Sequence, residues 1–256
     1  MRRSSSWTVA AAIFISLSVR GLPAGQPPPT ASSKDALNVL AKMVEAMGGR
    51  KLLASIKDAT LKGTAEMVQT GLSGPITIYQ KEPNKLRMDL DLSSIAPGRI
   101  FTLAFDGTKG WGTDVRTWAN EAMSEASSQD FSHQAVGNDS LLDPRKLGIV
   151  YVLKPRATLD GRDYIVLEQT LADGHKTLFY VDPETYLTYK FATTSLDPVT
   201  GAVVEIESVL GEYRRAGGLM INHSVRTYNG GTEIERLTIT AVVHNSALND
   251  ALFILK

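Results

Sequence analysis

Hydrophobic and polar residues alternate along most of the chain from Ala59 onward. In the stretches 59–67 and 85–92, most alternate positions are apolar or small and the residues between them are polar or charged. A period of two is typical of a strand in a sheet with one apolar and one polar face. The alternation therefore predicts a largely β structure.

Turn signals separate these runs at regular intervals. Asp-Gly and Asn-Gly pairs tolerate the positive φ values of tight hairpins, and proline presets φ in other turns. Such residues, with further glycines, occur at 71–74, 82–84, 96–98, 106–107, 160–161, 173–174, 182–183, 197–198, 217–218 and 229–231. The runs between them predict about eleven strands, nearly all joined to their sequence neighbours, in an antiparallel meander.

Helical spacing appears near the start of this region. Leu37, Leu40, Val44 and Met47 recur at intervals of three and four, Ser32 or Ser33 can cap the first turn, and glycines follow at 48–49. This pattern predicts a helix through about residue 47, with a short second turn over 50–56. One stripe of the helix must pack on an apolar surface.

Residues 116–148 interrupt the alternation. Good helix formers run from Trp118 to Ala126, a polar stretch follows, and a second short helix is predicted from Asp139 to Leu147. An insert of this length in a compact domain is often functional, and we interpret it as a lid. A mobile surface loop is the alternative.

The predicted fold class is α+β, mainly β. A meander of this size must close into a barrel or curl and have its apolar face covered. The N-terminal helix and the short helices of the insert are small covers for so large a face. We therefore expect a strongly curved, incomplete barrel whose interior is either packed or open as a cavity.

Every second residue of a strand points to the same face of the sheet, and this alternation identifies the residues of the candidate inner face. A strand of about ten residues spans ~33 Å, which is long enough to lie along an acyl chain. An ordinary packed core is the alternative for any one of these positions. The candidate lipid-binding residues are Ile76, Ile78, Leu86, Met88, Leu90, Phe101, Leu103, Phe105, Leu187, Tyr189, Phe191, Leu237, Ile239 and Val243.

The first residues predict export. Arg2 and Arg3 precede an apolar run from Trp7 to Val19, and small residues follow at 22–25. This arrangement is typical of a cleaved signal peptide over 1–25, with an uncleaved anchor as the alternative. A Pro/Ser-rich spacer over 26–33 and a single domain over 34–256 complete the predicted organisation, and we expect a periplasmic protein.

The amino-acid composition excludes several kinds of site and ligand. The chain contains no cysteine, which excludes disulfides, thiolate zinc sites and lipid attachment through an N-terminal cysteine. Without Arg2, Arg3 and Arg20, 24 basic residues face 27 acidic ones, so a formal charge of about −3 gives no basic face for nucleic acid. We expect a monomer.

No catalytic pattern stands out. The four histidines, His133, His175, His223 and His244, show no metal-binding spacing, and GxSxG, GxGxxG and GxxxxGK[ST] motifs are absent. We expect surface positions for His133 and His175 and a buried one for His223. The sequence names no metal, no cofactor and no nucleophile with a base, so we do not expect an enzyme.

Several short motifs occur in an order that resembles a known family. They are 46–49 with Leu52 and Ile56, 74–83 with 85–87, 105–107 leading to 110–111, 141–143, 160–162 with Tyr164, 180–185 and 217–219. Together they resemble LolA-like periplasmic lipoprotein carriers, in the broader group of outer membrane lipoprotein-sorting proteins. The resemblance covers nearly all of the chain from about residue 36 to 253.

The resemblance implies a half-barrel with a hydrophobic cavity for acyl chains. It also implies a carrier function toward the outer membrane, with a lipid or acylated lipoprotein as cargo and membrane-bound donor and acceptor proteins as partners. Two alternatives stay open: a periplasmic sensor or protein-interaction module of the same fold, and an enzyme acting on a lipophilic substrate.

Overall fold

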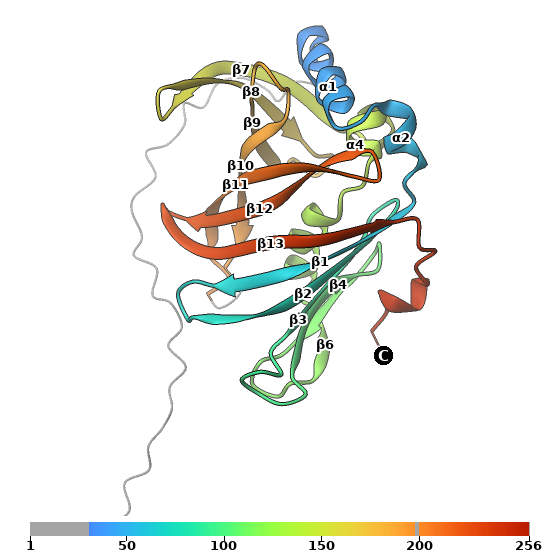
Figure 1. The fold of residues 1–256 in the computed structure, drawn as a ribbon, viewed down its shortest axis with the longest axis vertical. Coiled ribbons are helices and arrows are strands. Elements are labelled where there is room, and N and C mark those ends of the chain that lie inside the picture. The colour runs from blue at the N-terminus through green and yellow to red at the C-terminus, as the bar shows by residue number, and fades with distance from the viewer. Residues whose placement is uncertain (1–30, 198–199, 256) are drawn as a thin grey trace, which may run out of the picture.

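The computed structural model describes residues 31–197 and 200–255, so the predicted signal peptide and most of the spacer lie outside the described residues. Within this part of the chain, thirteen strands form one curved antiparallel sheet in the order β6-β5-β4-β3-β2-β1-β13-β12-β11-β10-β9-β8-β7 (Figure 1). The two edge strands do not pair with each other, so the sheet stays open and the expected incomplete barrel is confirmed.

The sheet has two strands more than the expected eleven, and its two shortest strands, β5 and β6, extend one edge. The first half of the sheet contains β1 (Asp58–Met67), β2 (Leu72–Lys81), β3 (Lys85–Asp91), β4 (Ile100–Phe105), β5 (Gly110–Thr113) and β6 (Asn120–Ala122). The second half contains β7 (Val150–Leu159), β8 (Arg162–Thr170), β9 (Lys176–Val181), β10 (Thr188–Leu196), β11 (Val203–Ala216), β12 (Leu219–Asn229) and β13 (Thr232–His244).

The two halves are meanders joined through one long-range pairing. The first strand, β1, pairs with the last strand, β13, in the middle of the sheet. The edge strands β6 and β7 are connected through residues 123–149. This connection passes across the concave side, because its residues Phe131 and Ala135 pack into the apolar cluster of β1–β4 and β13. In Figure 1 its last α-helix, labelled α4, lies beside the N-terminal helices α1 and α2.

The N-terminal helices form where the sequence predicts them. Helix α1 (Lys34–Ala46) begins at Ser33, whose Oγ accepts a hydrogen bond from the backbone N–H of Ala36 at 3.2 Å. Its stop is the Gly48-Gly49 pair, with φ values of 128° and 91° that suit glycine. Helix α2 (Arg50–Ser55) follows directly.

The insert, residues 116–148, differs in part from the expectation. Its elements are β6, α3 (Glu125–Ser132), η1 (His133–Ala135), α4 (Asp139–Leu142) and η2 (Pro144–Leu147). The helix expected over 118–126 is wrong in its first part, because residues 120–122 pair with β5 as a strand. The Oγ of Ser124 then accepts a hydrogen bond from the Ser127 N–H and caps α3.

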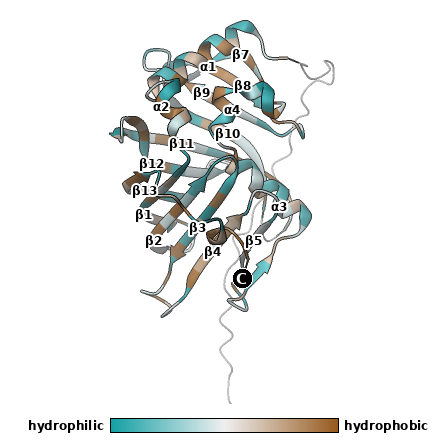
Figure 2. Cartoon of the chain, turned by 90° about the vertical axis from the view of Figure 1, so that its right-hand side faces the viewer, coloured by the Kyte–Doolittle hydropathy of each residue, from teal (hydrophilic) through white to brown (hydrophobic). Residues whose placement is uncertain are grey.

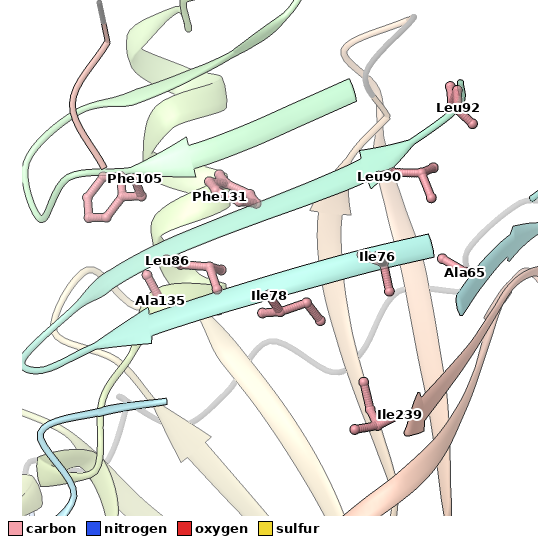
Figure 3. Close-up of a cluster of buried hydrophobic side chains, with 10 residues drawn as sticks. All are labelled: Ala65, Ile76, Ile78, Leu86, Leu90, Leu92, Phe105, Phe131, Ala135 and Ile239. Atoms are coloured by element: carbon pink, nitrogen blue, oxygen red, sulfur yellow. The ribbon is translucent and has the colours of Figure 1, made fainter. Parts of the chain in front are cut away.

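The apolar core lies on the face of the sheet that the insert covers, which we call the inner face. The first cluster joins β1–β4 and β13 to the insert, and Figure 3 shows Phe131 and Ala135 among the side chains of β2–β4. The second cluster joins α1 to β7–β9 through Ala36, Leu40, Tyr151, Leu167 and Val181. Figure 2 shows hydrophobic and hydrophilic residues alternating along the strands of the middle of the sheet, such as β12 and β13.

The opposite, outer face is less polar than the alternation indicates. Trp111 is only 4% exposed, and its Nε1–H donates a hydrogen bond to the Phe253 carbonyl at 2.7 Å. Arg87 donates to the Leu252 carbonyl at 2.8 Å. The C-terminal segment, including η3 (Asp250–Leu252), therefore covers the outer face of β3–β5.

Candidate ligand-binding face

Eleven of the fourteen predicted residues lie side by side on the inner face. Backbone register places Ile76 opposite Leu90 and Leu90 opposite Phe101. The other residues of the set stand two or four positions along the same strands or opposite such positions on adjacent strands, so their side chains share one face. These eleven residues are Ile76, Ile78, Leu86, Met88, Leu90, Phe101, Leu103, Phe105, Phe191, Leu237 and Ile239.

The inner-face placement of Val243 is wrong, because a β-bulge changes the parity of β13. The register passes from Lys62 opposite Ala241 to Gly63 opposite Ile239, which leaves one extra residue in β13. A Cβ at Gly63 would lie 1.9 Å from a backbone oxygen of β13, so glycine permits this close approach. As a result, Val242 packs on the first cluster and Val243 is 54% exposed.

The inner-face placement of Tyr189 is also wrong, and Leu187 lies outside the strand that was expected to contain it. Tyr189 is the extra residue at a second irregularity, between Thr188 and Lys190. Its ring stacks at 4.7 Å on Tyr164, a neighbour of Ile165, and it is Ile165 that packs on the inner-face cluster. Leu187 precedes β10, in the turn where its carbonyl accepts a hydrogen bond from the Asp182 N–H at 3.0 Å.

Part of the apolar inner face stays accessible to solvent. Met67, Met88, Phe101, Leu103 and Leu237 are only half-buried although they pack against the first cluster. The insert covers their neighbours mainly with Phe131, which is 5% exposed. Contiguous apolar surface of this kind marks interaction sites for apolar ligands or partners.

Polar contacts hold the insert to both halves of the sheet. On one side, the Gly110 N–H donates to Ser128 Oγ at 2.7 Å. On the other, Ser195 Oγ donates to Asp130 Oδ2 at 2.7 Å. Since β5 and β10 lie eight positions apart in the strand order, α3 spans the hollow.

A histidine pair completes this attachment. The rings of His133 and His175 stack with centroids 3.7 Å apart and planes at 17°. Asp173 Oδ2 lies 2.8 Å from His133 Nε2 and accepts from Gln129 Nε2 at 3.2 Å. Both histidines were expected at unrelated surface positions, and nothing in the spacing of residues 42 positions apart signals this contact.

Burial and charge set the protonation of this group. Burial raises the pKa of Asp173, but hydrogen bonds from His133, the His175 N–H and Gln129 outweigh it and bring the pKa to about 2. Burial, together with the adjacent His133, lowers the pKa of His175. The contact between insert and sheet therefore favours an uncharged His175 beside an ionised Asp173.

A separate surface pocket of about 340 Å³ lies between α1, α2 and the second half of the insert. Leu37, Val44 and Leu141 line its apolar part, and Arg50 and Arg145 lie at its edge. None of the fourteen predicted residues lines this pocket. It reaches only the lower end of the usual size range for small-molecule sites, about 300–1,000 Å³.

Within residues 31–197 and 200–255, no group of three or more histidine and carboxylate side chains is arranged to hold a metal ion. In the same part of the chain, none of the helices has the length and apolar character needed to cross a membrane.

Known structures share this architecture at low sequence identity. No family model and no curated protein matches the sequence. A DUF1329 family protein from Desulfovibrio piger superimposes with a TM-score of 0.60 at 14% identity, over 89% of this chain and 100% of its own. A domain described as that of an outer membrane lipoprotein-sorting protein, from Vibrio parahaemolyticus, has a TM-score of 0.57 at 12% identity, over 86% and 96% of the two chains.

A LolA superfamily protein from Nitrosomonas europaea gives a TM-score of 0.55 at 16% identity, over 86% of this chain and 97% of its own. At such identities the likeness concerns the fold. The chain, with its single open antiparallel sheet, therefore has a LolA-like fold.

Proposed function

We propose that this chain is a periplasmic carrier that binds the acyl chains of a lipid or lipoprotein on its inner face and transfers them toward the outer membrane. The observation that carries the proposal is the apolar inner face, aligned in register across β1–β4 and β13 and only partly covered. Solved relatives in fold include a domain described as lipoprotein-sorting.

The apolar area is sufficient for such a ligand. Burial of about fourteen methylenes contributes ~11 kcal/mol at ~0.8 kcal/mol each, before ordering costs are subtracted. Half-buried Met67 and Met88 suit this use, because unbranched methionine side chains adapt to different ligand shapes. The binding residues would be the eleven inner-face residues named above.

The insert would act as the lid. Phe131 and Ala135 occupy the first cluster in this structure, so an acyl chain that enters there must displace them. Helix α3 and η1 of the insert are joined to the second half of the sheet by a few polar contacts, each worth about 0.5–1.5 kcal/mol, which binding energy of the size given above can offset. The later part of the insert stays packed on the second cluster through Val136, Leu141 and Leu147, so the moving part of the lid would be α3 and η1.

The test is direct identification of bound cargo. The chain from Gln26 onward would be produced in a bacterial periplasm, purified without detergent and extracted with organic solvent for mass spectrometry. We expect a stoichiometric lipid or acylated peptide, lost in Phe101→Asp, which changes a half-buried position on the inner face, and retained in Val243→Asp, which changes an exposed position on β13. A folded protein that yields no acylated molecule would contradict the proposal.

A further inference from the structure

The inner face contains a polar interruption in the middle of one row. Successive pairings place nine residues of adjacent strands abreast, from β7 to β2. In order they are Leu153, Leu167, Phe179, Phe191, Ser208, Thr227, Glu235, Met67 and Leu72. Six are apolar, and the three polar ones, on β11, β12 and β13, are consecutive.

The two hydroxyl residues of this row are well buried. Ser208 is 4% exposed and Thr227 is 9% exposed, and their Oγ and Oγ1 atoms lie 3.3 Å apart. Burying polar groups costs free energy unless they have hydrogen-bond partners, and an apolar pair at these positions would extend the apolar row without that cost. A polar pair here indicates a requirement other than core packing.

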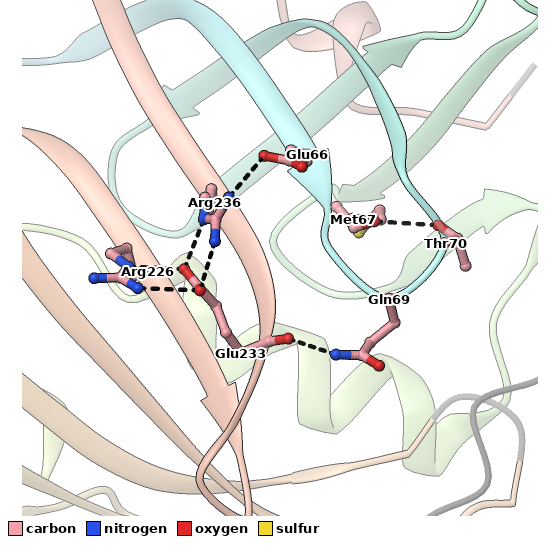
Figure 4. Close-up of polar contacts among 7 residues, drawn as sticks. All are labelled: Glu66, Met67, Gln69, Thr70, Arg226, Glu233 and Arg236. Carbon is pink, nitrogen blue, oxygen red and sulfur yellow. Dashed lines mark hydrogen bonds and ion pairs between the residues drawn. The ribbon is translucent and has the colours of Figure 1, made fainter.

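Glu235 differs from the glutamate two residues before it. Glu233 lies on the outer face, where both Arg226 and Arg236 bind its carboxylate at 2.7–3.0 Å (Figure 4). The irregular register between Thr227 and Tyr228 turns Glu235 to the inner face instead. There it is half-buried, and none of the ion pairs found among the described residues involves it.

The surroundings of Glu235 disfavour charge. Burial raises its pKa, against a smaller opposing effect of the Thr227 hydroxyl, and the row neighbour on its other side is Met67. Burial penalises every charged group in this way, so a ligand carboxylate placed beside Glu235 would also be disfavoured. The site therefore suits a neutral group that can both donate and accept hydrogen bonds.

We propose that Ser208, Thr227 and Glu235 form the polar binding site for the head of an acylated ligand whose head is a neutral amide, or a neutral ester that carries a hydroxyl group. The ligand's tail would extend from the site along the apolar part of the inner face. This inference rests on the proposed acyl-binding function and adds the class of head group that the chain selects.

Two probes of equal chain length test the selection: monolauroylglycerol, with a neutral ester head, and laurate, with a carboxylate. Calorimetric titration at pH 7, below the aggregation concentration of each probe, would measure both dissociation constants. We expect the wild-type chain to bind monolauroylglycerol at least tenfold more tightly than laurate. Glu235→Leu should abolish this preference, while Glu235→Gln, which keeps a neutral hydrogen-bonding group, should retain it.

Glu205→Leu is the matched control, because Glu205 is exposed on β11, the strand of Ser208, and its alternation with Val204 and Ile206 places it on the outer face. It should leave both constants unchanged. Equal affinities of the wild-type chain for the two probes, or an unchanged preference in Glu235→Leu, would overturn the head-group site and leave the proposed function standing. No binding of either probe by the wild-type chain would overturn both.

Discussion

Removing the apolar anchor of the insert should separate the stability of the lid from that of the sheet. Phe131 is the buried residue of α3, is 5% exposed, and packs into the first cluster. Truncation of a buried phenylalanine to alanine costs about 3–5 kcal/mol in general. The polar contacts through Asp130 and His133 would remain, so we expect the insert to open locally before the sheet unfolds.

A loss of about 3 kcal/mol corresponds to a roughly 100-fold increase in the open population, because each ~1.4 kcal/mol is a factor of ten. Hydrogen exchange followed by mass spectrometry should then show amides of α3 and η1 exchanging about 100-fold faster in Phe131→Ala. Amides of β12 and β13 should change little. Val203→Ala, at a position that is 69% exposed, is the control and should leave both regions unchanged.

Two results would refute this reasoning. Unchanged exchange in α3 would mean that Phe131 does not hold the insert in place. Equal loss of protection in the insert and in the central strands would mean that the insert unfolds only with the whole domain, which is incompatible with a separable lid.

Three further predictions follow from individual residues. Gly63→Ala should lower the urea midpoint strongly, since its Cβ would lie 1.9 Å from a backbone oxygen, whereas Gly211→Ala, whose Cβ would meet only a carbon at 3.8 Å, should change it by less than about 1 kcal/mol. The pKa of His175 lies below its ordinary 6.5 when the insert is docked, so the docked form binds a proton less readily than an opened form. Docking of the insert should therefore be fully stable above pH 6.5 and weaken as the pH falls below that value. Exchange of α3 amides, corrected for intrinsic rates, should therefore accelerate between pH 7 and pH 5.5, and a pH-independent ratio would contradict the role of the stacked ring. Leu90→Asp should unfold the chain or reduce its melting temperature by many degrees, while Val243→Asp should have almost no effect, and the reverse order would invert the assignment of faces.

Local pattern alone determined the class of the fold. Residues 33–49 contain their own cap, apolar stripe and glycine stop, so α1 forms where these signals place it. Alternation in β2, β3 and β4 likewise determines which side chains share a face, because parity within one regular strand does not depend on the rest of the chain. The predictions for Ile76, Leu90 and Phe101 depended on nothing more.

Only the tertiary structure decided where a β-bulge between two paired strands changes the face to which the side chains point. A bulge is a mismatch in length between partners, and one extra residue moves every later side chain to the other face; this is why Val243 and Tyr189 were misplaced. The inward turn of Glu235 beside the outward Glu233 has the same origin. Parity assumes a regular ladder, and only the pairing shows where the ladder is irregular.

The long-range contacts were also decided by the assembled sheet. Pairing of β1 with β13 joins segments near opposite ends of the chain, and docking of the insert joins His133 to His175 across 42 residues. Neither pairing has a local signal, because its stabilisation comes from surfaces that exist only once the sheet has curved. The sequence determined the strands and their apolar face, and the tertiary structure determined what lies across that face and where it becomes polar.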